Sequence, residues 1–505
     1  DSAVTLMCLL PVPDAVWWND VDTQRRPPAY RTTGHWLKAP VGANGNVSQY
    51  PLACVTGGSV LGDSGLAVAV PLDHPCVFRT GYVGTPGLLY VAIDLGLTHA
   101  TVKFPNKAQF GFVLYRTEAQ WGFRDALRRY YELFADDFAV RVNKIGSWVC
   151  WGNLADVPNF EDFGFQYHWG PGGPPAVAYD DDHSVASFVY NDSVRYFADL
   201  GIFPTRPTRE QAAKVFEELL STPDPAKLVL SRDPKATGRA RYRTRQNLLG
   251  EAGAERWLKD SLEAARLSAC LDADGVYHVG YLTNRPDWGP KDWWTGRLFC
   301  NPDPDIPGGY GQFLFSHMLE PDFERYRAEG AELDGVGLDN YFTYANLLNF
   351  RQEHFAYVDY PLSFDPNTLR PAAVGDFITY EWVAELSRRM HEQGKWLIAN
   401  QCLWPYPFAA RVLDIHGFEW GIQRSGPIAR ALAYHKPVVS LPVADEHYQE
   451  PFVRDHVRFG FLPGGYAQRD FAERPGVRSL YRRYMPALLA CARAGWEPVT
   501  HARSN

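Results

Sequence analysis

From residue 144 onward, short apolar runs alternate with amphipathic helical stretches, and this alternation constrains the fold more than any other feature of the sequence. Strands that alternate with helices are typical of α/β proteins built from β/α units. Eight runs have the composition of strands, namely 146–151, 185–190, 297–301, 335–339, 396–400, 415–420, 437–442 and 459–462. Eight such strands predict a closed (β/α)₈ barrel of the TIM type over residues 144–505.

The expected helices have good local signals. Thr208 with Gln211 forms a capping-box pattern before the helical stretch 212–220, and the stretch 375–393 ends at Gly394, directly before a strand candidate. The segments 252–271 and 481–495 also have the composition of helices. A doubly wound open sheet is the competing architecture, but no glycine-rich loop of the GxGxxG or GxxxxGKS type opens a helix, which disfavours a nucleotide-binding sheet.

The first 115 residues have a different pattern. At 505 residues the chain exceeds the size at which single cores stop growing, roughly 250 to 300 residues, so a second domain is expected. Apolar runs at 66–70, 88–93 and 101–104 are broken by Gly, Pro and Asn, which predicts a β-rich, sandwich-like domain over residues 1–115. A capping-box pattern, Thr117 with Gln120, then predicts a linker helix within 116–143.

Charge and hydropathy exclude several classes of partner. The formal net charge is −8 with both signs interspersed, so no basic face is expected for nucleic acid. No apolar run approaches the roughly 18 residues of a membrane span. We expect a soluble protein; a chain that begins at Asp1 without Met is compatible with a removed leader and export to a secreted or periplasmic location, but the location and the oligomeric state are not fixed by the sequence.

Two carboxylates follow strand candidates and are the proposed catalytic pair. In the segment 333–341, Asp339 ends the strand whereas Asp334 begins it, and barrel active sites form where strands end. Glu419 ends the strand two positions later. Cleavage of a glycosidic bond needs one carboxylate at the anomeric carbon and one carboxylic acid to protonate the leaving oxygen. The alternative for each is a helix N-cap or a surface charge.

Other polar and aromatic residues near strand ends are candidates for binding sugar hydroxyls and rings. The aromatic content, 14%, is high, although much of it is expected in the core. Trp148 and Trp151 lie on the first strand, where their rings could either fill the barrel or form the floor of a sugar subsite. The remaining candidates for substrate binding are Asp192, Asn340, Tyr341, Asn400, Gln401, Trp404, Trp420 and Asp445, of which Asp445 is also the runner-up acid/base.

No cofactor is required by the expected chemistry. The acidic run 180–183 could supply oxygen ligands to a structural Ca²⁺, but it lacks the spacing of a calcium loop, and a solvated acidic turn is the favoured interpretation. No HExxH pattern marks a zinc site, and no GxSxG elbow marks a serine nucleophile.

With Asp339 after the fourth strand candidate and Glu419 after the sixth, the layout resembles the retaining α-glycosidase barrels of the α-glucosidase and α-galactosidase clans. The string 334–340, Asp-Gly-Val-Gly-Leu-Asp-Asn, is also similar to the strand motif of endo-α-polygalactosaminidase-like barrels. The motif departs from that of the α-glucosidases, which usually place a Trp and a Met around the nucleophile where this chain has Gly337 and Asn340. A C-terminal β-domain, common in these relatives, would lie beyond the present chain.

The resemblance implies a glycoside hydrolase that acts on α-linked oligo- or polysaccharide, with Asp339 as nucleophile and Glu419 as general acid/base. Two alternatives stay open: a carbohydrate-binding barrel without catalysis, and a transglycosylase or lyase that uses the same cleft.

Overall fold

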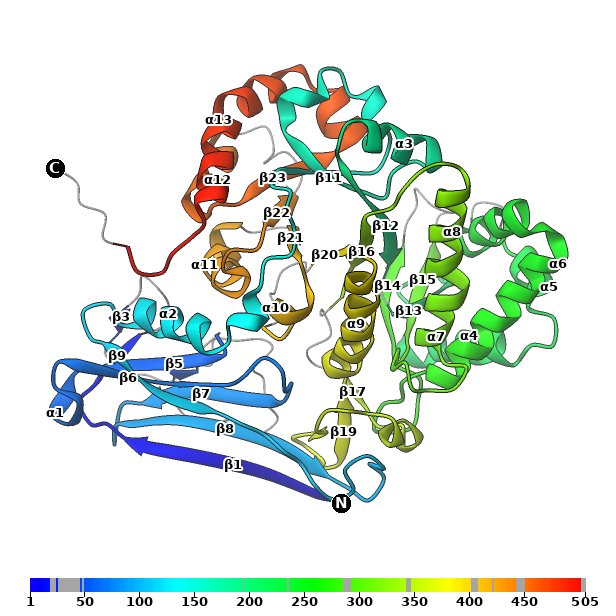
Figure 1. The fold of residues 1–505 in the computed structure, drawn as a ribbon. Coiled ribbons are helices and arrows are strands. Elements are labelled where there is room, and N and C mark those ends of the chain that lie inside the picture. The colour runs from blue at the N-terminus through cyan, green and yellow to red at the C-terminus, as the bar shows by residue number, and fades with distance from the viewer. Residues whose placement is uncertain are drawn as a thin grey trace.

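The computed structural model describes residues 1–18, 24–25, 46–47, 50–192, 194–233, 236–284, 292–341, 347–400, 407–419, 422–441 and 450–500. Two antiparallel sheets come first, then a closed barrel of parallel strands, in agreement with the expected fold class (Figure 1). Within these ranges, no helix has the length and apolarity needed to cross a bilayer.

The N-terminal part consists of two antiparallel sheets whose apolar faces pack together. One sheet has the order β1 (Ser2–Pro11), β8 (Leu88–Leu97), β7 (Val77–Val83) and β4 (Asn46–Val47); the other has the order β3 (Gln24–Arg25), β2 (Val16–Trp18), β5 (Leu52–Thr56), β6 (Ser64–Ala69) and β9 (Val113–Glu118). Side chains such as Leu52, Val68 and Val91 are buried between them. The inner positions are apolar because burying them removes apolar surface from water.

Helix α2 (Phe123–Leu133) connects the sheets to the barrel. Its Tyr130 hydroxyl donates to the carbonyl of Val70, 2.8 Å away, and its Tyr131 hydroxyl donates to that of Ala431, 2.7 Å away. The capping box expected at Thr117 is wrong: Thr117 pairs with Gly65 within the sheet, and the helix begins after Gly122, whose φ of 49° belongs to the left-handed region that favours glycine.

The barrel contains eight parallel strands, and the last pairs with the first. In order around the barrel they are β10 (Ser147–Cys150), β11 (Phe165–Trp169), β12 (Ala186–Asp192), β16 (Gly335–Asp339), β20 (Trp396–Asn400), β21 (Ile415–Glu419), β22 (Val438–Leu441) and β23 (Leu462–Tyr466). Two strand predictions were wrong. Strand β11 was not predicted, and 297–301 was predicted as a barrel strand, whereas β15 (Trp293–Phe299) belongs to a separate antiparallel sheet.

The outer helices follow the expected pattern. They include α3 (Pro174–Asp182), α8 (Glu320–Ala328), α9 (Gly375–Glu392), α10 (Ala409–Val412), α11 (Ile422–Ala433), α12 (Glu450–Phe459) and α13 (Pro475–Ala494). Helix α9 matches the predicted stretch 375–393. A small sheet lies between β16 and β20 in the chain and has the order β17 (Leu348–Asn349), β19 (Pro371–Val374) and β18 (Ser363–Phe364). It contacts the N-terminal sheets, where the Gly96 N–H donates a hydrogen bond to the Leu362 carbonyl at 2.8 Å.

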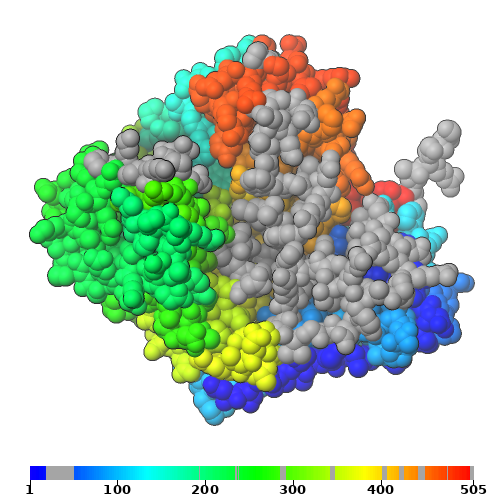
Figure 2. Space-filling view, turned by 180° about the vertical axis from the view of Figure 1, so that it is seen from behind, coloured from blue at the N-terminus to red at the C-terminus, as the bar shows by residue number. Residues whose placement is uncertain are grey.

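A large insert separates β12 from β16. It contains β13 (Arg195–Ile202), α4 (Arg209–Ser221), α5 (Pro225–Leu230), α6 (Thr237–Ser268), β14 (Val279–Asn284), β15, α7 (Tyr310–Leu314) and the π-helical turn η4 (Phe315–Leu319). Helix α4 begins with the predicted capping box of Thr208 and Gln211. The insert forms a lobe, green in the figures, at the side of the barrel (Figures 1 and 2).

Large rings and glycines fill the barrel interior together. The indoles of Trp148 and Trp169 stack with centroids 4.8 Å apart. A Cβ atom on Gly337 would lie 2.7 Å from the indole nitrogen of Trp169, and one on Gly417 would lie 3.3 Å from the Trp148 ring. The glycines therefore provide the space for the two indoles, which form a closed floor beneath the C-terminal rim of the barrel.

Candidate active site

Strand register brings three polar side chains to one level of the rim. Asp192 at the end of β12 is the register partner of Asp339, and Asp339 is the register partner of Asn400. Glu419 ends the next strand, β21, two residues beyond Gly417, which is the register partner of Asn400. Because alternate residues of a strand face the same side, Glu419 lies on the face of Gly417, toward the interior.

The amide of Asn400 lies between the two predicted catalytic carboxylates. Its Nδ2 atom donates to Oδ1 of Asp339 and to Oε2 of Glu419, and both distances are 3.1 Å. Asn400 itself is 97% buried in the rim, with 3% of its surface exposed. A single, well-packed donor thus holds one oxygen of each carboxylate, which brings both groups to the same point above the barrel.

Asp339 is in an environment that favours its protonated form. Burial raises the pKa of Asp339 to about 6, and the nearby carboxylates of Asp192 and Glu419 raise it as well. Hydrogen bonds from Tyr190 and Asn400 act in the opposite direction. Above about pH 6 the group is therefore ionised, with the charge stabilised by two donors.

The Tyr190 side chain supports Asp339 from the neighbouring strand. Its hydroxyl donates to Oδ2 of Asp339 at 2.9 Å, so the two oxygens of Asp339 each accept one bond from the protein. The ring of Trp151 lies over that of Tyr190, with centroids 4.4 Å apart, and 41% of Trp151 is exposed. Trp151 therefore has an exposed ring at the rim, and its stacking on a sugar stays a prediction.

Asp192 is bound by an arginine from the insert. Nη1 of Arg297 donates to Oδ1 of Asp192 at 2.8 Å, and the amide of Asn340 donates to the same oxygen at 3.4 Å. Arg297 lies on β15, so the insert contributes directly to the rim. The ion pair is about 15 to 18% exposed and is open to solvent and ligands.

Two residues predicted to bind substrate are fully buried. Tyr341 donates a 2.6 Å hydrogen bond to Oδ1 of Asn191 and stacks on Trp382, and it has no exposed surface. Trp148 is equally buried and takes the alternative in which the ring fills the barrel. In this arrangement both residues support the rim without lining it. Four further predicted residues, Gln401, Trp404, Trp420 and Asp445, lie outside the described residues and stay predictions.

The acidic run 180–183 lies at the end of helix α3. Asp180 is buried and accepts bonds from His168 and Ser187, both at 2.7 Å, whereas Asp181 accepts the Glu332 N–H at 2.9 Å. These carboxylates therefore serve different partners. In the part of the chain that the structure describes, no group of three or more His, Cys, Asp and Glu side chains is arranged to hold a metal ion.

Three residues at this rim were not predicted from the sequence. Tyr190 lies two residues before Asp192 on the same strand, so the two-residue period of the strand could have placed both on the inner face. Tyr466 ends β23; burial raises its pKa, and the charge of Glu419 raises it as well. Arg297 comes from a different sheet, and no local signal in the sequence indicates its partner.

Comparisons with known proteins add the following. No protein-family model and no curated protein sequence matches the chain. Similar solved structures include the cycloalternan-degrading enzyme from Trueperella pyogenes (8% identity, TM-score 0.45, covering 98% of this chain and 68% of that one). Another is the ligand-free α-N-acetylgalactosaminidase NagBb from Bifidobacterium bifidum (11% identity, TM-score 0.44, covering 95% of this chain and 77% of that one). A third is the glycoside hydrolase domain of PelA from Pseudomonas aeruginosa (12% identity, TM-score 0.31, covering 66% of this chain and 96% of that one). Values this low assign no residue roles.

Proposed function

We propose that the protein is a glycoside hydrolase that cleaves α-linked oligo- or polysaccharides with Asp339 as nucleophile and Glu419 as general acid/base. The observation that carries this proposal is the shared Asn400 amide, which gathers both carboxylates at the rim of the barrel. Asp339 ends the fourth strand of the barrel and Glu419 the sixth, the arrangement on which the resemblance to retaining α-glycosidases rests. That resemblance supports the α-linked substrate.

The bridging amide is compatible with a retaining mechanism. Two oxygens that are each 3.1 Å from one nitrogen cannot be farther apart than twice that distance. Inverting enzymes separate their carboxyl groups by roughly 6.5 to 9.5 Å to admit a water molecule, whereas retaining enzymes hold them about 5 to 5.5 Å apart. The limit set by Asn400 applies to the nearest oxygens of the two carboxylates, and it allows the separation of a retaining pair.

In the proposed reaction, an ionised oxygen of Asp339 attacks the anomeric carbon while Glu419 protonates the departing glycosidic oxygen. A covalent glycosyl-enzyme results, and Glu419 then takes a proton from the water that hydrolyses it. Tyr190 and Asn400 orient Asp339 by binding one oxygen each. Trp151 offers an exposed ring beside this point.

The test measures reducing ends and product masses released from a broad panel of glycans. We expect Asp339→Asn and Glu419→Gln to reduce release by roughly 10⁴-fold or more, the scale on which removal of a catalytic group acts. Asp334→Asn is the matched control, because Asp334 lies at the other end of the same strand and Asn can still accept its 2.8 Å bond from the Ser187 N–H. Undiminished release by folded Asp339→Asn would exclude the assignment; saturable binding without product would favour a non-catalytic barrel.

A further inference from the structure

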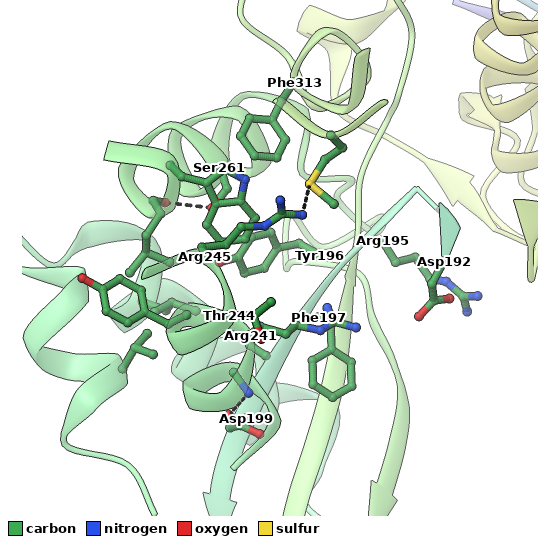
Figure 3. Close-up of a pocket in the computed structure, with 18 of the residues that line it drawn as sticks. Asp192, Arg195, Tyr196, Phe197, Asp199, Arg241, Thr244, Arg245, Ser261 and Phe313 are labelled. Carbon is green, nitrogen blue, oxygen red and sulfur yellow. Dashed lines mark hydrogen bonds between the residues drawn. The ribbon is translucent and has the colours of Figure 1, made fainter. Parts of the chain in front are cut away.

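A cavity of about 300 Å³ opens in the insert directly beside the candidate active site (Figure 3). Its wall begins with Tyr190, Asn191 and Asp192 on β12 and continues along β13 to helices α6 and α7. The volume lies at the lower end of the range for small-molecule pockets, roughly 300 to 1,000 Å³. The cavity therefore extends the rim by a space suited to a single small ring and its substituents.

The charges that line the cavity are unbalanced. Among the described residues of the wall, arginines supply the cations, namely Arg195, Arg232, Arg241 and Arg245, and only Asp192 and Asp199 supply anions. Asp192 is paired with Arg297. Asp199 accepts the Gly238 N–H at 2.7 Å and the Trp293 indole N–H at 3.3 Å. Neither carboxylate forms an ion pair with Arg241 or Arg245 of helix α6.

Arg241 and Arg245 are held by aromatic faces. The Arg241 guanidinium lies 4.6 Å from the ring centroid of Phe197, and that of Arg245 lies 5.0 Å from the ring centroid of Trp257. Arg245 donates a hydrogen bond to the sulfur of Met318, a weak acceptor 3.1 Å away. Among the described residues, no carboxylate lies within ion-pair distance of either guanidinium, so strong donors face the cavity without an anionic partner.

The surroundings of Arg245 also favour an added negative charge. Burial lowers the pKa of the Arg245 guanidinium; Asp322 raises it, and the like charges of Arg325 and Arg241 lower it. Asp322 is itself bonded to Arg325 at 3.2 Å. An anion between exposed Arg241 and half-buried Arg245 would relieve their repulsion and replace the hydration that Arg245 has lost.

The rest of the wall suits a sugar ring better than a bare inorganic ion. The ring of Tyr310 lines it. The rings of Tyr196 and Phe313 also line it, and Thr244 and Ser261 add hydroxyl groups (Figure 3). Aromatic faces stack on the C–H surface of a sugar, hydroxyls bind its hydroxyls, and an arginine fork matches a carboxylate. We propose that the cavity binds a uronic acid residue of the substrate glycan, with Arg241 and Arg245 holding its carboxylate. This assignment of substrate class rests on the proposed hydrolase function.

The test uses calorimetric binding to full-length protein carrying Asp339→Asn, so that no turnover occurs. The probes are α-linked trigalacturonic acid and its fully methyl-esterified form, which has the same rings and linkages without the negative charges. We expect the acid to bind at least about 10-fold more tightly than the ester, because hydrogen bonds from an arginine to a carboxylate are stronger than those to a neutral ester. Added salt should weaken the binding of the acid and leave the binding of the ester unchanged.

Variants in the same background locate the effect. Arg241→Gln and Arg245→Gln should each weaken binding of the acid about 10-fold and leave the ester unchanged. Arg243→Gln is the matched control, because Arg243 is an exposed arginine of the same helix that does not line the cavity. Equal affinity for acid and ester, no binding of the acid, or equal losses in all three variants would overturn the proposal. Acid-selective binding by a protein that hydrolyses no glycan would sustain the cavity assignment and reject the hydrolase.

Discussion

The hydroxyl of Tyr190 donates a 2.9 Å hydrogen bond to Oδ2 of Asp339, across neighbouring strands whose residues are 149 positions apart in the sequence. If Asp339 reacts as a carboxylate, this bond both orients it and stabilises its charge. Tyr190→Phe should therefore lower the rate of hydrolysis by roughly 10- to 100-fold, the value of a hydrogen bond to a charged group. The ring stays in contact with Trp151 and Trp169, so folding should be preserved.

Tyr484→Phe is the control for that substitution. It also removes a hydroxyl that binds a carboxylate, that of Glu450, but at the surface helices α12 and α13. Equal activity of Tyr190→Phe and the wild type on a substrate found in the glycan panel would show that the bond does not serve catalysis.

The pH dependence of hydrolysis separates the two possible roles of Asp339. Its pKa of about 6 means that the carboxylate form is lost as the pH falls through 6. A nucleophile must be ionised, so the rate at low substrate concentration should rise between about pH 5 and 7 and flatten above. A rate that instead falls with an apparent pKa near 6 would identify Asp339 as the proton donor.

Asp192→Asn should move the rise in rate with pH, the acid limb of the pH–rate profile, to lower pH. The negative charge of Asp192 raises the pKa of Asp339, so its removal lowers that pKa, and Arg297 is left beside the site as an uncompensated positive charge. We expect the midpoint of the acid limb to fall, measured from complete pH–rate profiles. Asp182→Asn, at the exposed end of α3, makes the same change in net charge and should leave the midpoint in place.

The contact between Gly337 and Trp169 predicts a loss of stability on adding one carbon atom. In Gly337→Ala the new Cβ would lie 2.7 to 2.9 Å from three atoms of the indole, and overpacking a well-filled core costs about 1 to 3 kcal/mol. Thermal unfolding should begin at a lower temperature. Gly476→Ala, whose Cβ would meet nothing within 4 Å, should not lower it.

Glu381 predicts a specific effect of pH on stability. Burial raises its pKa well above the ordinary value, and the carboxylates of Asp303 and Asp359 raise it further. A group with a raised folded-state pKa stabilises the fold at low pH, and that contribution is lost as the pH rises through the raised value. The thermal midpoint of the wild type should thus fall as the pH rises above the ordinary carboxyl range.

In Glu381→Gln the fall should be smaller, because the glutamine stays neutral and still accepts the 3.0 Å bond from the Asp359 N–H. Buried Asp376, with a raised pKa of about 7, contributes in the same direction in both proteins, so the difference between the two pH profiles is the quantity to measure. Glu392→Gln, at the exposed end of the same helix, should retain the slope of the wild type. Parallel profiles for all three would contradict the prediction.

Much of the barrel could be predicted because its strands are continuous apolar runs that end in polar residues. The predicted runs that end at Asp339 and Asn400 have the same first and last residues as the observed strands β16 and β20. The strand β11, Phe-Gln-Tyr-His-Trp, was missed because its aromatic and polar residues lack that signature. The run 297–301 looked similar to a barrel strand because local composition does not tell which sheet a strand joins.

In the candidate site, too, local sequence predicted some residues, whereas others depend on the tertiary structure. Direction along a strand was enough to choose Asp339 over Asp334 for the rim. The pairing of Asp192 with Arg297 was beyond prediction because it depends on how the insert folds back over the barrel. Burial of Tyr341 was also unforeseen, since a tyrosine beyond a strand end can turn either outward to solvent or, as here, toward Asn191.

The position of the insert has a consequence for the order in which the molecule folds. Most neighbouring strands of the barrel are joined through short β/α connections, but β12 and β16 can pair only after the whole insert has been looped out, and closing a longer loop costs more entropy. Pairings between residues distant in sequence form slowly. Apart from the seam between the first and last strands, β10 and β23, the seam between β12 and β16 joins the residues most distant in sequence, so Asp192, Tyr190 and Asp339 are expected to meet late in folding.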